Sequence, residues 1–591
     1  MKINSYNFLA STYMFGHLSP EAISMLAEEA SEIHLTAGEC LIQQGEVGDC
    51  LYVLCYGRLL VFHESGETSR FLGEVFPRET VGEMALLGEK IRSSYVIASR
   101  NSTMISISID TFERVIKAYP EIGIKLAQLI VKRTQKSLNS VTENRITTIT
   151  VIPTSNDPQF TGLASRVEAI LAKKYHVIRI TKTLVVNNGL DYRNETSENL
   201  IEFFSENELN HEFVIYDCEQ SDERWKNLCI HQSDCLLLFD DDTGSQHTEF
   251  LNKLGFPRVN IHVPIYLACI HPSHTLVNIP QIHPSVAKVS HLTFSDPETF
   301  ERLIRVVTGH TFGVLLGGGG ASGFAHIGVL RAFEEYNISI DVIAGVSSGS
   351  IIAAQYAMGL SAREILEANK LASALAAKYM RHPSIPIISL YSNKKFKKYL
   401  SDFFNDMKIE NLWRNYFAIS CDLSLKKLHA HDRGLLHEAV YASNAIVPLI
   451  PPAVKKGHLY VDGGYINTVP GDIFREHYHG IILGVDVAKE DNFYVNPEWI
   501  NYPSNAEILW KRINPFAKKI SVSGMVDLML RAMSLGRNIN IKNTQTLFDH
   551  YLVPPVDHIG FLDFSKINVL EEIGYEYARE QIESWHNQFP Y

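Results

Sequence analysis

Cysteine is scarce in this chain, which has eight in 591 residues, and no two of them form a CxxC pair. A disulfide framework and a structural zinc site are therefore not expected, and this usage fits a reducing compartment. The histidines of HAH (His429, His431) and HYH (His477, His479) are only weak ligand patterns. We expect no metal centre.

Long hydrophobic runs are also missing. No stretch reaches the roughly 18 uninterrupted apolar residues that indicate a membrane-spanning helix. The opening MKINSYNFLASTYMFGHL has no basic segment followed by a long apolar run, so we expect no secretory signal. The sequence therefore predicts a cytoplasmic protein whose contact with membranes is peripheral.

An excess of positive charge is absent as well, since 54 lysines and arginines face 66 acidic residues and the net charge is −12. Bulk charge thus disfavours nucleic acid as a partner. The composition, 46% hydrophobic and 20% charged, is that of a folded globular protein rather than a disordered one. At about 150 residues per domain, the length indicates three to four domains.

Residues 1–140 are predicted to form a β jelly roll with helix. Apolar runs such as CLYVLCYGRLLVF and MISISI lie between Ile33 and Ile109 and are separated by glycines. Short strands at such turn-rich spacing are typical of a jelly roll or sandwich. A helical periodicity follows from Asp110 to Leu138, and Pro120 is expected to kink or break it.

Residues 146–308 are predicted to form a middle α/β segment. Continuous apolar runs favour a parallel sheet that is buried on both faces. The runs are ITTITVIP, HVIRIT, EFVIYDCE, DCLLLFD and HVPIYLACI. The first run leads into SNDPQF and not into a GxxxxGK[ST] loop, so nucleotide hydrolysis is not expected here.

Residues 310–591 form the third expected domain and carry the chemistry. The strand-like TFGVLL leads into four glycines, Gly317, Gly318, Gly319 and Gly320, and the helical pattern FAHIGVLRAFEEY follows. Consecutive glycines let backbone N–H groups crowd around a negative oxygen, and a helix N-terminus favours negative charge. The loop could cradle a phosphate, stabilise a tetrahedral oxyanion, or simply form a tight turn.

A GxSxG pattern, Gly345-Val346-Ser347-Ser348-Gly349, decides between these uses. It follows the short strand IDVIA and precedes the helical segment SIIAAQYAM. Strand, sharp turn and helix are the context that a nucleophilic serine of this kind requires. We take Ser347, the central position, as the candidate nucleophile.

An aspartate followed by two glycines completes the set. The apolar run LYV leads into Asp462, Gly463 and Gly464. A carboxylate at a strand end can take the proton of a serine hydroxyl within hydrogen-bond reach. Taken alone, the pattern is more often an ordinary Asp-Gly turn.

These three motifs, in this order, resemble the patatin-like phospholipase family, and the neuropathy target esterase subgroup in particular. The stretches IENLWRNYFAISCDL and YASNAIVPLIPPAVKKGHLYVDGGYIN belong to the same resemblance. It implies an α/β hydrolase that needs no cofactor and cleaves acyl esters of phospholipids or lysophospholipids. It also implies Ser347 as nucleophile, Asp462 as general base, and the oxyanion loop at Gly317, Gly318, Gly319 and Gly320.

One departure and two alternatives accompany this resemblance. The family usually has an arginine where this chain has Ser322. A conventional triad would need a histidine after the acid, and candidates such as His477, His479, His550 and His558 follow Asp462. The alternative functions are a general carboxylesterase or neutral lipase, and a cyclic-nucleotide sensor or scaffold with a weak hydrolase domain.

The stretch VGEMALLGEKIRSSYV suggests a ligand for the N-terminal domain. A carboxylate, Glu83, and a guanidinium, Arg92, suit the ribose hydroxyl and the phosphate of a cyclic nucleotide. The stretch resembles the cyclic-nucleotide-binding domain of catabolite-activator type. That resemblance implies a site for cAMP or cGMP at Gly82, Glu83, Ala85, Arg92 and Ser93, with the nucleotide as regulator.

A basic segment offers one route to the membrane surface. Lys511, Arg512, Lys518 and Lys519 stand beside apolar residues and precede SGMVDLMLRAMSLGRNINI. A basic amphipathic segment can lie on anionic lipid, but a core helix with a solvated basic turn fits equally well.

Overall fold

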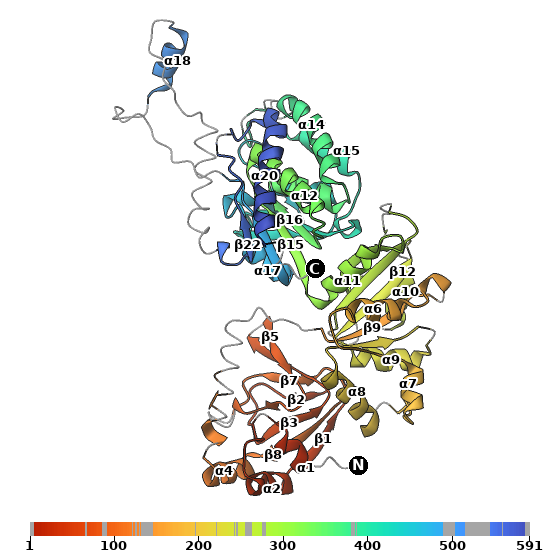
Figure 1. The fold of residues 1–591 in the computed structure, drawn as a ribbon. Coiled ribbons are helices and arrows are strands. Elements are labelled where there is room, and N and C mark those ends of the chain that lie inside the picture. Colours follow the sequence, from red (N-terminus) through yellow and green to blue (C-terminus); the bar gives the residue numbers. More distant parts are fainter. Residues whose placement is uncertain are drawn as a thin grey trace. The chain divides into compact units, whose positions relative to one another are not determined.

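The computed structural model forms two compact units (Figure 1). The first comprises Met1–His274 and Ile279–Thr308, and the second continues from Gly309 to Tyr591. The structure describes residues 5–585 except 13, 66–67, 85–90, 121, 125–126, 129–130, 132–145, 156, 195–196, 220, 242, 244–245, 255–262, 275–278, 280, 380–383, 386, 489–502, 515–543 and 558.

The N-terminal part is a jelly roll of two four-stranded antiparallel sheets, as predicted. Their orders are β1-β8-β3-β6 and β2-β7-β4-β5. Helix α4 ends one residue before Tyr119, so it stops ahead of Pro120. The elements are α1 Ser5–Ala10, α2 Pro20–Glu28, β1 Ser31–Leu35, β2 Cys40–Ile42, β3 Cys50–Tyr56, β4 Leu59–Ser65, β5 Thr68–Val75, β6 Thr80–Val81, β7 Tyr95–Ala98, β8 Ser102–Ser108 and α4 Ile109–Ala118.

The middle part is an all-parallel sheet of order β10-β11-β9-β12-β13-β14. All five predicted strands are present, and β14 is a sixth. The elements are β9 Thr148–Pro153, η1 Pro158–Phe160, α6 Leu163–Leu171, β10 Val177–Ile180, α7 Lys182–Asn187, α8 Glu198–Asn210, β11 Phe213–Asp217, α9 Glu223–Gln232, β12 Cys235–Asp241, α10 Gln246–Lys253, β13 Ile265–His271, β14 Val286–Thr293 and α11 Pro297–Thr308.

A buried ion cluster joins the jelly roll to the middle sheet within the first unit. Arg58 and Arg100, from two turns of the jelly roll, both bind the Asp234 carboxylate that precedes β12. Arg100 also pairs with Glu208 of α8. Burial alone raises the pKa of Asp234, but the two arginines hold it well below its ordinary value. The two domains therefore share buried, mutually compensating charges.

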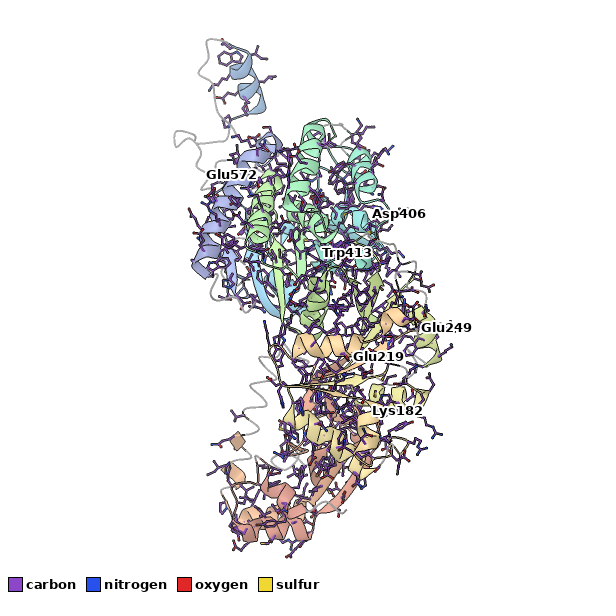
Figure 2. The ribbon with its side chains drawn as sticks, turned by 45° about the vertical axis from the view of Figure 1, so that its right-hand side comes forward. Lys182, Glu219, Glu249, Asp406, Trp413 and Glu572 are labelled. Carbon is purple, nitrogen blue, oxygen red and sulfur yellow. The ribbon has the colours of Figure 1, made fainter. Side chains whose placement is uncertain are left out.

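The second unit is built on a mixed sheet of order β19-β20-β17-β16-β15-β21-β22, with β18 on β17. Helix α20 packs on α12, where Glu572 (Figure 2) pairs with Arg331. The elements are β15 Thr311–Leu316, η2 Gly320–Phe324, α12 Ala325–Glu335, β16 Val342–Val346, α13 Ser348–Ala357, α14 Ala362–Tyr379, α15 Lys394–Phe404, η3 Ile409–Asn411, β17 Asn415–Asp422, β18 Lys427–His431, α16 Leu436–Ser443, β19 Ala453–Lys455, β20 His458–Asp462, η4 Gly463–Tyr465, α17 Gly471–His477, β21 Gly480–Val485, α18 Asn505–Ile513, β22 His550–Leu552, η5 Phe564–Lys566 and α20 Ile567–Trp585.

The predicted fold class, a jelly roll followed by an α/β segment and an α/β C-terminal domain, is confirmed. Among the helices that the structure describes, none has the length and hydrophobicity needed to span a bilayer.

Candidate active site

Ser347 stands at a sharp turn between β16 and α13. Its backbone is in the left-handed region, with φ 53° and ψ −127°, which a non-glycine residue rarely adopts. Such strain is typical of a serine that a strand-to-helix turn presents to substrate. The Ser347 N–H donates to Ser443 Oγ at 2.9 Å, and the Ser347 carbonyl accepts from Ser350 Oγ at 2.6 Å. Neighbouring serines thus hold the turn from both sides.

Glycines on either side make this turn possible. A Cβ on Gly349 would lie 2.2 Å from the Leu316 carbonyl oxygen, and one on Gly345 would lie 2.4 Å from the Gly349 backbone. Both distances are too short for any side chain, so the GxSxG spacing reflects the packing of the helix start against β15. Gly318 approaches the serine itself, because its added Cβ would lie 3.1 Å from Ser347 Cβ.

Strand register brings Asp462 to the level of Ser347. Val346 pairs with Ile419 of β17, and the next residue, Ser420, pairs with Asp462 of β20. Asp462 Oδ1 accepts the Gly464 N–H at 2.8 Å. Oδ2 is buried and has no full hydrogen bond among the described residues. One oxygen of the carboxyl group is therefore anchored by a backbone N–H, and the other is buried without a full hydrogen bond.

The electrostatics of Asp462 suit a proton acceptor. Burial raises its pKa to about 6, while the Ser347 hydroxyl and the Gly464 N–H offset part of the rise. A carboxylate with a pKa near 6 is ionised at neutral pH and is more basic than an ordinary aspartate. The neighbouring hydroxyl is the group whose proton it could take.

The glycine loop lies against both the serine and the end of the sheet. Its first two amides are engaged, because Gly317 donates to the Val485 carbonyl and Gly318 to the Thr468 carbonyl. The Gly319 N–H donates weakly to Ser348 Oγ at 3.3 Å, and Gly320 has no acceptor among the residues that the structure describes. The amides in the second half of the loop are therefore the less engaged ones.

A histidine that sequence reasoning missed supports this loop. His326, fully buried at the start of α12, donates Nε2–H to the Gly317 carbonyl oxygen at 2.8 Å. Burial lowers its pKa to about 4, so the ring is neutral at physiological pH. Its position in the helical pattern FAHIGVL was visible, but its carbonyl partner was not. Ser322, where the family usually has arginine, is also buried, and its hydroxyl has no partner among the described residues.

Of the four histidines of the triad alternative, the three that the structure describes lie elsewhere in the second unit. His479 precedes β21, and its carbonyl accepts a hydrogen bond from Thr311, the first residue of β15. His479 therefore lies at the amino ends of these parallel strands, whereas Ser347 follows the carboxyl end of β16. His477 ends α17, where its ring stacks on Phe417. The His550 ring stacks on Trp585 of α20. His558 is outside the described residues.

The candidate nucleotide residues gather between β6 and β7 in the first unit. Arg92 is buried and donates to the carbonyls of Gly82 at 3.0 Å and Cys50 at 2.7 Å. The Asp49 carboxylate lies 4.0 Å from the Arg92 guanidinium and is 85% exposed. Glu83 is also buried, Ser93 is exposed, and Ala85 lies outside the described residues.

In the middle sheet, a carboxylate occupies the helix N-terminus that follows the first strand. Glu219 (Figure 2) accepts the N–H groups of Gly162 and Ala164, at 2.8 and 2.9 Å, with its two oxygens. In nucleotide-binding α/β folds, a phosphate binds at this position. Here the protein supplies the negative charge itself, in keeping with the missing GxxxxGK[ST] motif.

Only part of the predicted basic segment is described. Lys511 lies on α18 and pairs with Glu507 at 2.8 Å. Arg512 belongs to the same helix. Lys518, Lys519 and the apolar stretch after them lie outside the described residues.

Comparison with known proteins assigns three family domains along the chain. The cyclic nucleotide-binding domain matches residues 32–119, the neuropathy target esterase family P-loop like domain matches 145–272, and the patatin-like phospholipase domain matches 314–475. The chain carries a patatin-like phospholipase domain together with a P-loop like domain of the neuropathy target esterase family. The predicted family is thus confirmed, and the residues of the glycine loop, the serine turn and the DGG turn fall within the hydrolase domain.

Curated relatives match this chain along nearly all of its length. Patatin-like phospholipase domain-containing protein 7 of Mus musculus is 27% identical over 94% of this chain and 45% of its own length. Protein 6 of the same series in Homo sapiens is 26% identical over 93% of this chain and 44% of its own. Neuropathy target esterase sws of Drosophila melanogaster is 26% identical over 93% and 42%. The chain therefore spans less than half the length of these relatives.

Among solved structures, a cyclic nucleotide-binding-like protein from Brucella abortus is 30% identical over 19% of this patatin-like chain and 97% of its own, with a TM-score of 0.18.

Proposed function

We propose that this chain is a serine hydrolase that cleaves acyl ester bonds of phospholipids or lysophospholipids through a Ser347–Asp462 dyad. The register that sets the strained serine and the buried aspartate at one level is the observation that carries the proposal. Residues 310–591 would form the catalytic domain, 1–140 its regulator and 146–308 the connecting domain. The activity requires no metal or cofactor.

The reaction is a two-step acyl transfer. Asp462 takes the proton of the Ser347 hydroxyl as that hydroxyl oxygen attacks the ester carbonyl carbon. The loop of Gly317, Gly318, Gly319 and Gly320 would stabilise the oxyanion, and the Gly319 and Gly320 N–H groups would do so most directly because those of Gly317 and Gly318 are engaged by main-chain carbonyls. Collapse of the tetrahedral intermediate releases the lipid alcohol, which receives the proton from Asp462. Water then attacks the acyl-enzyme, with Asp462 again as base, and frees the fatty acid.

Fatty-acid release from lysophosphatidylcholine, phosphatidylcholine and a water-soluble short-chain ester tests this function. Ser347→Ala should lower kcat at least about a thousandfold on every ester that the wild type cleaves, because it removes the oxygen that attacks the ester carbonyl. Ser373→Ala, on helix α14, is the matched control and should keep full activity. Equal rates for wild type and Ser347→Ala would refute the enzyme. Cleavage of the short ester alone would favour a general carboxylesterase.

We further infer that the jelly roll binds a cyclic nucleotide, cAMP or cGMP, and thereby regulates the hydrolase. Glu83 would accept the ribose hydroxyl, and Arg92 would neutralise the phosphate, with Gly82, Ala85 and Ser93 lining the site. In support, the buried Arg92 guanidinium donates to main-chain carbonyls, while its carboxylate neighbour Asp49 is largely solvated. A buried cation of this kind favours an anionic ligand.

Calorimetric titration of the full chain with cAMP and with cGMP tests the inference. Arg92→Gln should weaken binding at least about tenfold, since it removes the charge that meets the phosphate. Arg114→Gln, on the exposed face of α4, is the control and should bind as the wild type does. A wild type that binds neither nucleotide at millimolar concentration would overturn the inference.

A further inference from the structure

Two neighbouring hairpin tips in the second unit combine exposed apolar side chains with lysines. One tip joins β17 to β18 and reads Leu423-Ser424-Leu425-Lys426-Lys427, and the other joins β19 to β20 and reads Val454-Lys455-Lys456-Gly457. We call them the hairpin tips. The apolar side chains are largely exposed, namely Leu423 at 50%, Leu425 at 54%, Val454 at 72% and Leu459 at 41%.

Backbone and side-chain hydrogen bonds hold the two tips together. The Leu423 N–H donates to the Leu459 carbonyl at 2.8 Å, and the Leu459 N–H donates to Ser424 Oγ at 3.1 Å. Val454 pairs directly with Leu459 across β19 and β20. The exposed apolar side chains therefore form one patch rather than scattered surface residues.

A buried carboxylate fixes the shape of this patch. Asp422 Oδ1 accepts the N–H groups of Ser424 and Leu425, at 2.8 and 3.1 Å. Its Oδ2 bonds to His458 Nδ1 at 2.8 Å, at the start of β20. One side chain thus links both tips. Because Asp422 itself is buried, the exposed charge at the patch comes from Lys426, Lys427 and Lys456, with half-buried Lys455 beside them.

The patch projects from the catalytic edge of the sheet. β17 runs parallel to β16 and continues three residues beyond Ile419, the partner of Val346, before the first tip begins. On β20, Leu459 stands only three residues from Asp462, which is about 10 Å along a strand. The tips therefore extend beyond the edge of the sheet at which Ser347 lies.

We propose that the hairpin tips dock the hydrolase on an anionic lipid surface and so bring the active site to its substrate. The inference rests on the proposed function in that the docked surface supplies the ester. Exposed leucine and valine side chains insert at the headgroup boundary, and the lysines pair with anionic headgroups. The local charge matters more because the chain as a whole carries −12 and is repelled by such a surface.

Vesicle flotation of the full chain tests the docking directly. Vesicles of phosphatidylcholine with one quarter phosphatidylserine are compared with phosphatidylcholine alone, and Ser347→Ala is used as the background so that hydrolysis does not change the lipid. The double variant Lys426→Glu/Lys456→Glu should lower the partition constant on anionic vesicles at least about tenfold. Leu425→Ser/Val454→Ser should lower it by a similar factor on both vesicle types.

Matched variants elsewhere on the second unit control for net charge and hydrophobicity. Lys394→Glu/Lys398→Glu on α15 removes the same charge, and Leu562→Ser/Val569→Ser removes side chains that are 50% exposed. Both should bind vesicles as the background does. Equal loss in controls and tip variants, unchanged binding of the tip variants, or no binding of the parent chain would each overturn the docking. If the parent chain binds no vesicles, the hairpin tips would instead be a surface for a protein partner.

A soluble ester separates this proposal from the proposed function. With Ser347 intact, the tip variants should cleave the short-chain ester at the wild-type rate and lose turnover only on vesicles. If the wild type cleaves no ester while the tips still govern vesicle binding, the enzyme is refuted and the docking stands. Slower cleavage of the soluble ester by the tip variants would count against docking, because it would place the tips in the active site.

Discussion

At the residue scale, the buried Asp462 has to meet two opposing demands. It must lose its proton to act as a base, yet burial raises the pKa of this carboxyl to about 6. Ionisation of Asp462 therefore costs the folded state free energy, and the resulting carboxylate is a stronger base than that of an ordinary aspartate. Catalytic groups in other enzymes show the same trade between stability and reactivity.

The pH dependence of Asp462 follows from this. For the wild type, kcat/KM should fall about tenfold per unit below pH 6 and level off above it. The folded pKa exceeds the unfolded one, so the folded state binds the proton more tightly and stability is lost as pH rises from about 4 to 6. Asp462→Asn should abolish turnover, yet gain up to about 3 kcal/mol relative to wild type between pH 4 and 7.

Denaturant unfolding and initial rates between pH 4 and 8 measure both effects. Asp472→Asn, an exposed aspartate in the first turn of α17, is the control and should change neither the rate nor the pH dependence of stability. A rate profile that is flat through pH 6, or a stability difference between wild type and Asp462→Asn that does not grow with pH, would remove Asp462 as the base.

His326 is expected to act as a positioning residue for the glycine loop. His326→Leu removes the Nε2–H donor to the Gly317 carbonyl and should lower kcat about 10- to 100-fold with little change in KM. His326→Gln can place an N–H near the same point and should recover most of the rate. Because the pKa of His326 is about 4, neither variant should shift the rate profile near pH 6. Equal losses in the two variants would mean that the ring acts only by packing.

At the element scale, the turn between β16 and α13 depends on a glycine that no side chain can replace. Gly349→Ala would bring its Cβ 2.2 Å from the Leu316 carbonyl oxygen and 2.6 Å from that of Gly317. Both are backbone atoms, one at the end of β15 and one at the start of the glycine loop, and cannot swing away. We expect a loss of about 1–3 kcal/mol in unfolding free energy and a strongly reduced kcat.

Thermal unfolding and soluble-ester turnover check this expectation. The control is Gly560→Ala, whose Cβ would meet only Asp563 Cβ at an ordinary 3.6 Å. It should keep both stability and rate. If Gly349→Ala retained the wild-type rate, the helix start would not set the position of Ser347.

Sequence patterns predicted strands well where a run of apolar residues marked them. The apolar runs at β11 and β12 gave strands in a parallel sheet, as the structure has them. β14 was missed because VAKVSHLT interrupts its apolar residues with polar ones. Periodicity likewise did not predict the antiparallel extension of β17 through β18, β19 and β20, because that pairing depends on residues far apart in the sequence.

The candidate site divides along the same line. Ser347 and Asp462 stand in compact motifs, and their chemical roles stay predictions, although the register brings them level. His326 and Ser443 carry no local signal, because each acts through a partner in another element. The distinction between engaged and open amides in the glycine loop depends on Val485 and Thr468, more than 140 residues away.

At the scale of the whole molecule, the first unit holds together through charge as well as packing. Asp234 receives Arg58 and Arg100 from the jelly roll and also accepts the N–H groups of Thr147 and Thr148 at the start of β9. A buried carboxylate with this many partners couples the two domains. A change of state in the jelly roll therefore has a physical route to the middle sheet.

Asp234→Asn tests this coupling. The substitution leaves two buried guanidinium groups short of compensating charge and should cost about 3–5 kcal/mol. The arginines hold the pKa of Asp234 below its ordinary value, so its stabilisation is present above about pH 4 and is lost as pH falls further. Amide hydrogen exchange at pH 7 should quicken on both sides of the cluster, at the Arg58 and Arg100 turns and at the start of β9.

Asp217→Asn is the matched control, because it breaks the 2.9 Å pair with Arg179 inside the middle sheet and leaves the jelly roll untouched. Faster exchange there should stay within β10 and β11. Exchange in the jelly roll that is unaffected by Asp234→Asn would mean that the two domains unfold independently. Any control that cyclic nucleotide exerts on the hydrolase would then have to bypass Asp234.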